Sequence, residues 1–277
     1  MPELPEVETM VRGVRHHCEG RTLLKVEFLE CTRRPIPVLP SRKQFEAQAG
    51  RTVTKVGRLG KRALFFLDSG SVMIIEPRMT GLLLVSSAPS EEHRRVCWHF
   101  PKQRGKSDTV EFWDRRGLGT LSLLSADQFA ELQQRLGPDA LEIKVDEWTQ
   151  RLMKTSRPIK VALLDQSLVA GIGNLYASEI LHRSGISPKR KASRLRMSEI
   201  NKMAEATLQI LSTAIRYEGS TLNDGTYRNA LAESGGYQNH HQVYDRAGET
   251  CPACGQSEIR RIVQAQRSTF YCPNCQK

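Results

Sequence analysis

The sequence predicts an α+β chain with a β-rich N-terminal half, a helical C-terminal half and a short cysteine-rich end. Three observations support this prediction. Short β-type runs separated by turn residues fill the stretch between residues 22 and 123. Helical spacing of apolar residues dominates between residues 126 and 217. Four of the seven cysteines lie in two Cys-x-x-Cys pairs close to the end of the chain.

The first element is a helix near the N-terminus. Val7, Met10, Val11 and Val14 fall at positions i, i+3, i+4 and i+7, which gives one buried stripe. Pro5 lies in the first turn, where the missing N–H has little cost.

Six short runs in the N-terminal half are predicted to be strands. They are Leu23–Phe28, Arg51–Val56, Ala63–Leu67, Val72–Ile75, Leu82–Val85 and Val110–Trp113. The tetrapeptide from Asp68 to Ser71 is a hairpin turn between two of them. Several strands at this spacing predict a sandwich or a barrel.

Five helices are predicted after the strands. They are Ala126–Leu136, Asp146–Met153, Ile159–Gln166, Leu175–His182 and Ser198–Tyr217. The stretch from Gly219 to Gly236 is rich in glycine, asparagine and serine and is expected to be a long loop. A loop of this length is usually a functional lid or is disordered.

The charge balance points to an anionic partner. There are 41 Lys and Arg residues against 30 Asp and Glu, a net charge of +11. Nucleic acid is favoured over an anionic membrane or a merely solubilising charge. No apolar run approaches the roughly 18 residues of a membrane span, and the acidic N-terminus does not resemble a secretory signal. We therefore expect a cytoplasmic protein with no membrane partner.

The cysteine pairs predict a metal site. Cys251, Cys254, Cys272 and Cys275 enclose the 17 residues from Gly255 to Tyr271, a spacing typical of four-cysteine zinc sites. Four thiolates leave no open coordination position, so one structural zinc ion is expected. The alternatives are free thiols or two disulfides, and an intracellular compartment argues against the disulfides.

A glycine-punctuated turn joins two of the predicted helices. Gly171 and Gly173 would let the backbone approach a partner closely, and Asn174 would cap the next helix or donate to a phosphate. An ordinary capped helical hairpin is the alternative.

The opening residues suggest amine chemistry. Removal of Met1 would expose the secondary amine of Pro2 beside the carboxyl groups of Glu3 and Glu6. A terminal amine is less basic than a lysine side chain, so more of it is uncharged near neutral pH. Such an amine can attack a sugar carbon to give an iminium ion, and the carboxyls can move the protons. A proline-rich arm without chemistry is the alternative.

Taken together, four segments resemble the formamidopyrimidine-DNA glycosylase family, which includes the endonuclease-VIII-type enzymes. The segments are MPELPEVET, LLDQSLVAGIGNLYASEIL, QVYDRAGETCPACG and AQRSTFYCPNCQK. The resemblance covers nearly the whole chain. It implies an N-terminal β-sandwich domain with flanking helices, and a C-terminal helical domain with a helix–two-turn–helix and a zinc ribbon.

The resemblance also implies domain boundaries and partners. We expect the sandwich in residues 1–130, a linker in 131–150, the helical domain with a lesion-capping loop in 151–240, and the zinc ribbon in 241–277. The expected partner is double-stranded damaged DNA, bound by a monomer.

Residue roles carry over position by position. Pro2 matches the nucleophile, Glu3 the general acid and base, Glu6 a nearby acid, and Lys61 the lysine of a catalytic hairpin, for which a solvated loop lysine is the alternative. Phosphate-contacting positions match Lys160, Asn174 and Arg267. The side chains expected to fill the gap left by a flipped nucleotide are Met79, Arg116 and Leu118, although Met79 has a core methionine as its alternative.

Two segments depart from the family pattern. Residues 76–81 read EPRMTG where the family often has HLGMSG, and residues 114–119 read DRRGLG where it often has DPRRFG. One arginine is lost at Gly117, and Leu118 is smaller than the usual aromatic. The resemblance implies a glycosylase and abasic-site lyase for oxidised purines. The alternatives are an enzyme for oxidised pyrimidines and a protein that binds damaged DNA without cutting it.

Overall fold

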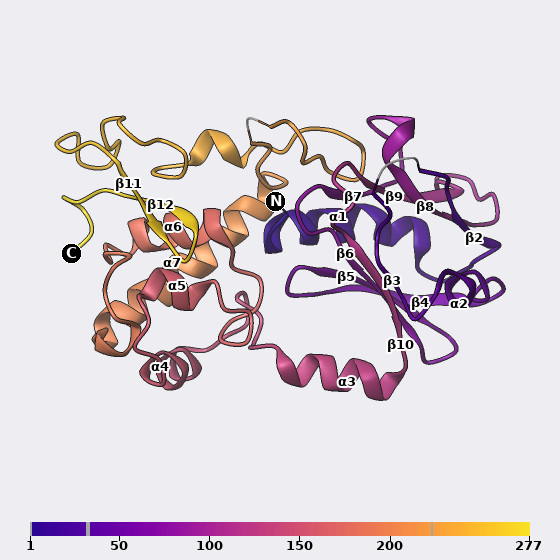
Figure 1. Cartoon of the computed structure of the whole chain (residues 1–277), viewed down its shortest axis with the longest axis horizontal. Helices are drawn as coiled ribbons and strands as arrows, with labels where there is room; N and C mark the ends of the chain where they lie inside the picture. The colour runs from indigo at the N-terminus through magenta and orange to yellow at the C-terminus, as the bar shows by residue number, and fades with distance from the viewer. Residues whose placement is uncertain (1, 32–33, 223) are drawn as a thin grey trace. The chain divides into compact units, whose positions relative to one another are not determined.

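The computed structural model describes residues 2–31, 34–222 and 224–277 of the chain. They form two compact units (Figure 1). The first contains Met1–Gln134 and Ile215–Gln238, and the second contains Arg135–Ala214 and Asn239–Lys277. The predicted α+β class with a β-sandwich is confirmed. The long loop after residue 218 belongs to the first unit, and the boundaries expected at residues 130, 150 and 240 stay predictions.

Two sheets form the sandwich of the first unit. The six-stranded sheet has the order β1-β4-β5-β6-β10-β3, and the four-stranded sheet has the order β2-β8-β9-β7. The strands of the first are Arg21–Thr22, Thr52–Leu59, Arg62–Leu67, Val72–Glu76, Thr120–Leu124 and Val38–Leu39. Those of the second are Lys25–Phe28, Arg94–His99, Thr109–Asp114 and Gly81–Leu84. Within the pairs of strands, only β10 with β3 runs parallel among the described residues.

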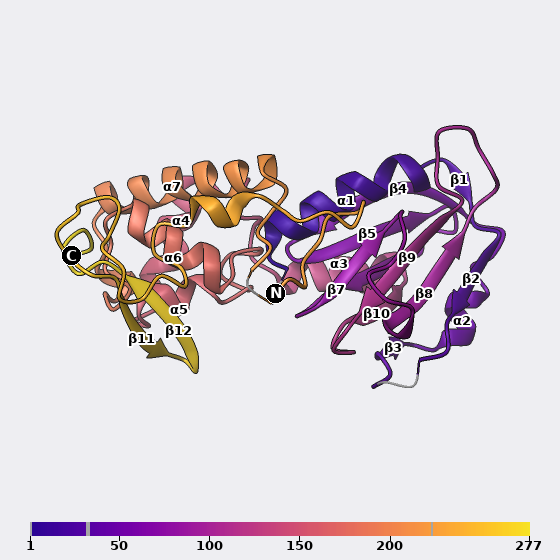
Figure 2. The same cartoon turned by 90° about the horizontal axis from the view of Figure 1, so that it is seen from above.

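Helix α1 (Leu4–Cys18) belongs to the same core as both sheets. It contacts β4 and β5 of one sheet and β7 and β9 of the other, and Figure 2 shows it running alongside the strands. Its predicted stripe of Val7, Met10, Val11 and Val14 is fully buried. The two sheets meet at Phe65 and Trp98, whose ring centroids are 5.5 Å apart. The N-terminal helix is therefore anchored in the hydrophobic core of this unit.

Two further helices pack on the sandwich. Helix α2 (Arg42–Glu46) contributes Phe45 to the core, and α3 (Ala126–Arg135) covers Leu64 and Ile74 of the six-stranded sheet with Phe129. The sequence did not predict α2, nor the strands β1, β3, β8 and β10. Strand β8 is missed because it begins with two arginines, of which Arg95 is 3% exposed and uses its guanidinium inside the fold.

The second unit is built on helices. They are α4 (Val145–Met153), α5 (Ile159–Leu163), α6 (Asn174–Arg183) and α7 (Met197–Arg216). Helix α6 is the central one, since every residue from Leu175 to His182 is buried. Helix α5 ends three residues earlier than predicted, because Gln166 binds the following turn, as described below. Among the described residues, no helix is both long and apolar enough to cross a membrane.

The second unit ends in a ribbon. Strands β11 (Arg260–Gln264) and β12 (Arg267–Tyr271) pair antiparallel. Ala265 and Gln266 form the turn with positive φ angles, so Arg267 follows it directly. Strand β12 contacts helix α6.

Candidate active site and metal centre

The predicted nucleophile and acids lie at the start of α1. Pro2 is buried, and Glu3 and Glu6 are each 3% exposed. The backbone N–H of Glu3 donates to Glu6 Oε2 at 2.9 Å. The other oxygen of Glu6 accepts the N–H of Ser220 at 2.9 Å. Glu6 thus fixes the backbone beside Pro2 to the first residues of the long loop.

The long loop is packed against this site. Gly219 lies so close to Glu6 that a Cβ there would be 2.9 Å from the Glu6 carboxylate. Tyr227 is 4% exposed and donates from its hydroxyl to the carbonyl of Glu218 at 2.9 Å. Burial, and then the nearby Glu6 carboxylate, raise the pKa of Tyr227 well above its usual value. Sequence reasoning missed Tyr227, since one tyrosine in a glycine-rich stretch gives no signal of its partners.

Lys61 lies in the turn between β4 and β5, as the match to a hairpin lysine requires. A salt bridge from β4, next to this turn, connects the hairpin to α1. Arg58 donates to Glu8 Oε2 at 2.8 Å and to the carbonyl of Gly60 at 3.0 Å. Burial acts to raise the pKa of Glu8, but hydrogen bonds from Arg58 and Arg12 prevail and lower it. The hairpin tip is therefore held to the helix that begins beside Pro2.

Asp114 connects residues 76–81 with residues 114–119, the two segments expected to fill the space that a flipped nucleotide leaves in the duplex. Its carboxylate is fully buried and accepts from the hydroxyl of Thr80 and from the N–H groups of Arg116 (3.2 Å) and Gly119 (2.7 Å). Its carbonyl accepts two hydrogen bonds from Arg95, at 3.0 and 2.7 Å. The buried carboxylate of Asp114 thus binds both the backbone of Arg116, whose side chain is exposed, and Thr80, which follows Met79.

The three candidate side chains differ in exposure. Arg116 is exposed, while Met79 and Leu118 are half-buried. Met79 lies in the turn after β6 and is not a fully buried core methionine. Gly117, between the other two, has a φ of +62°. A Cβ at this position would lie 2.4 Å from the carbonyl oxygen of Arg34.

We expect Asp114→Ala to lower the free energy of unfolding of the first unit by about 3 kcal/mol, because several buried donors lose their acceptor. Urea titration of the purified chain measures this loss. Asp68→Ala is the matched control, since Asp68 also accepts a backbone N–H, at 3.1 Å, but is exposed. A loss below about 1 kcal/mol for Asp114→Ala would contradict its role as an anchor.

The predicted phosphate-contacting residues come together in the second unit. Asn174 begins α6, and its Oδ1 accepts from Lys160 Nζ at 2.6 Å. Its Nδ2 donates to the carbonyl of Ser268 on β12 at 2.9 Å. Lys160 also donates to Thr269 Oγ1 at 3.2 Å and is fully buried, whereas Arg267 is exposed. The structure therefore places Lys160 beneath Asn174 and leaves Arg267 open to solvent.

Gln166 braces the glycine turn before α6. Its Oε1 accepts the N–H of Gly171 at 2.9 Å, and its Nε2 donates to the carbonyl of Ile172 at 2.9 Å. Sequence reasoning identified the glycines but missed this side chain, because its two partners follow five and six residues later in a turn of irregular shape.

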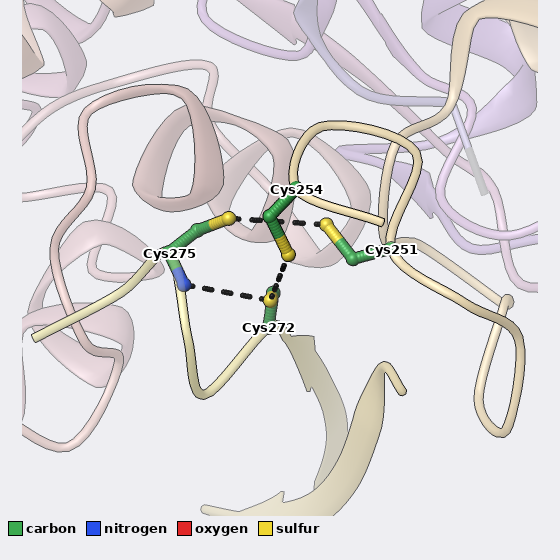
Figure 3. Close-up of side chains that lie close together, drawn as sticks. All are labelled: Cys251, Cys254, Cys272 and Cys275. Carbon is green, nitrogen blue, oxygen red and sulfur yellow. Dashed lines mark hydrogen bonds between the residues drawn. The ribbon is translucent and has the colours of Figure 1, made fainter. Parts of the chain in front are cut away.

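The four paired cysteines form one cluster in the second unit. Their sulfur atoms all lie within 4.8 Å of one another (Figure 3). The Sγ atoms of Cys251 and Cys275 are 3.9 Å apart, and those of Cys254 and Cys272 are 3.7 Å apart. Four converging thiolates match the tetrahedral coordination of structural zinc. A small core that includes Val243, Ile259 and Phe270 surrounds the cluster.

Three families match consecutive parts of the chain. Residues 1–121 match the formamidopyrimidine-DNA glycosylase N-terminal domain, residues 136–226 match the H2TH domain of the same enzymes, and residues 248–277 match the zinc finger found in FPG and IleRS. The zinc-finger match and the cysteine cluster agree, and the cofactor is one structural zinc ion.

Curated relatives match over the full length of the chain. The formamidopyrimidine-DNA glycosylase of Chloroflexus aurantiacus is 40% identical over 100% of this chain and 98% of its own length. The enzyme of the same name from Streptococcus pneumoniae is 35% identical over 100% of this chain and 99% of its own length.

Solved structures of Fpg proteins also match nearly the full length of the chain. The MutM (Fpg) protein from Thermus thermophilus is 36% identical with a TM-score of 0.84, over 99% of this chain and 98% of that one. The Lactococcus lactis Fpg in complex with DNA containing an abasic site is 32% identical with a TM-score of 0.86, over 99% of both chains.

The fold and these sites define the class as a DNA glycosylase with a β-sandwich, a helix–two-turn–helix and a zinc ribbon. The chain belongs to the formamidopyrimidine-DNA glycosylase family.

Proposed function

We propose that Pro2 is the nucleophile of this chain and that its DNA substrate carries oxidised purines. Family membership makes the chain a DNA-formamidopyrimidine glycosylase of base excision repair that also has abasic-site lyase activity. One observation carries the assignment to Pro2. The residue is buried and precedes Glu3, the N-cap of α1, and the buried carboxyl group of Glu6 accepts the backbone N–H of Glu3.

The proposed reaction begins with the damaged nucleotide flipped out of the duplex. The nitrogen of Pro2, freed by loss of Met1, attacks the C1′ carbon, the bond from C1′ to the base breaks, and the departing base takes up a proton from water. Glu3 protonates the sugar ring oxygen as the ring opens, and the amine loses its proton to give an iminium ion. Removal of a C2′ proton then expels the 3′ phosphate, and a second elimination expels the 5′ phosphate.

Glu6 supports this reaction as a positioning residue and does not touch the reacting atoms. It holds the N–H of Glu3 and the N–H of Ser220, so it fixes both the nucleophile's neighbour and the base of the long loop. We propose that Lys61 lies near the phosphates or the leaving base, from a hairpin tip that Arg58 holds to α1.

The second unit supplies contacts to the DNA backbone. We propose that Asn174 and Arg267 contact phosphates, since one lies at the start of α6 and the other is exposed after the ribbon turn. Lys160, the third residue that matches a phosphate-contacting position, also holds Asn174 in place by its hydrogen bond to Asn174 Oδ1. Met79, Arg116 and Leu118 fill the space that the flipped nucleotide leaves. The DNA complex of the Lactococcus lactis relative supports binding to damaged duplexes.

Borohydride trapping tests the proposal. We expect a reduced covalent adduct at Pro2, located by peptide mass spectrometry, when the chain meets duplexes with 8-oxoguanine or formamidopyrimidine. Duplexes with thymine glycol or dihydrouracil should react more slowly. A preference for these pyrimidines would assign the chain to the alternative substrate class. An adduct at another amine, or none from a chain shown to lack Met1, would refute the role of Pro2.

A further inference from the structure

A histidine of the central helix reaches the metal cluster. His182 lies in the last turn of α6, and its Nε2 atom is 3.5 Å from Cys251 Sγ. Both residues are buried, His182 with 7% exposure and Cys251 with none. They are 69 positions apart in sequence, so the contact joins α6 to the first cysteine pair of the ribbon.

We propose that His182 donates an N–H···S hydrogen bond from Nε2 to the thiolate of Cys251 and thereby stabilises the bound zinc ion. The cluster fits zinc, as its four converging sulfurs show. Four thiolates around one divalent cation leave two negative charges in a largely buried place. Donated hydrogen bonds disperse that charge, and groups that bind metal ligands in this way commonly change metal affinity by roughly 10–100-fold.

A second polar residue on the same helix face supports this reading. Glu179 lies three positions before His182, so the two side chains point to the same side of α6. Glu179 is 2% exposed and accepts the N–H groups of three successive residues, Gln242 (2.9 Å), Val243 (3.0 Å) and Tyr244 (2.8 Å). These residues lead into the ribbon, whose first cysteine is Cys251. One face of α6 therefore binds both residues 242–244, which lead into the ribbon, and the sulfur of Cys251.

The start of the same helix also binds the ribbon. Asn174 donates to Ser268, and Lys160 connects Asn174 to Thr269. Helix α6 is thus bonded to the ribbon at its first and last turns, and from its middle to the residues that lead into the ribbon. His182 makes the metal site part of this attachment, which goes beyond the catalytic proposal and does not depend on it.

Zinc release tests the proposal without any measurement of DNA cleavage. The zinc-loaded chain is mixed with excess 4-(2-pyridylazo)resorcinol, and the coloured zinc complex is followed with time. We expect His182→Phe to release zinc about 10-fold faster, because the ring stays and the N–H is lost. His182→Gln keeps an N–H donor and should stay within about 3-fold of the unaltered chain. His16→Phe, an exposed histidine of α1, is the control for a general effect of the substitution.

The outcomes are decisive in either direction. An unchanged rate for His182→Phe, or equal acceleration in the Phe and Gln variants, overturns the proposal. If His182→Phe does not fold, the unaltered chain loaded with cadmium-113 decides. Scalar coupling between the imidazole Nε2 proton and the cadmium supports the hydrogen bond, and a resolved Nε2 proton without coupling, or no Nε2 proton, overturns it.

Discussion

Glu3→Gln is expected to lower excision of 8-oxoguanine by about 10²–10⁴-fold, because an amide cannot supply the proton that the opening sugar ring needs. Cleavage at a preformed abasic site should fall far less, within about 10-fold, since the base is already gone. The variant should fold, because the N–H of residue 3 still donates to Glu6. Single-turnover kinetics on the two duplexes measure the difference.

The control for this prediction is Glu46→Gln, a change at an exposed glutamate of α2. It should leave both rates within about 2-fold of the unaltered chain. Equal losses on the two duplexes for Glu3→Gln would indicate a general structural role for Glu3. Undiminished excision would show that another group supplies the proton.

Cys272→Ser is expected to abolish stable zinc binding and to lower affinity for a duplex with an abasic-site analogue by at least about 100-fold. Zinc binding supplies about 10–16 kcal/mol to the folding of small zinc domains. The core around the cluster is small, so the ribbon cannot stay folded without the metal. Arg267 and the carbonyl that positions Asn174 both belong to this ribbon.

Zinc content and fluorescence anisotropy with labelled duplex measure these losses. Cys97→Ser is the matched control, because Cys97 is also a buried cysteine but lies on β8 outside the cluster. Its zinc content should equal that of the unaltered chain. Full DNA affinity in metal-free Cys272→Ser would contradict the role of the ribbon in binding.

Patterns with local causes could be predicted from the sequence. The buried stripe of α1 follows from the helical spacing of its apolar residues. The cysteine cluster could be predicted because ligand spacing is set by the geometry of the knuckles.

Features with distant causes could not be predicted. Arg95 in β8 is a buried cation that binds backbone carbonyls, so it does not resemble a core residue in sequence. The match of Asp114 to the family pattern gave no sign that it binds Thr80, which is 34 positions away. The contact of Lys160 with a phosphate stays a prediction, but neither its complete burial nor its hydrogen bond to Thr269, 109 positions away, could be predicted.

The close approach of Gly117 to Arg34 restricts how this chain can change. The family pattern that residues 114–119 resemble has arginine at the position of Gly117, but here a backbone oxygen fills the space that any side chain would need. Placing arginine there by a single substitution would push the carbonyl group of Arg34 out of place. A return to arginine at this position would therefore require the backbone at Arg34 to move first.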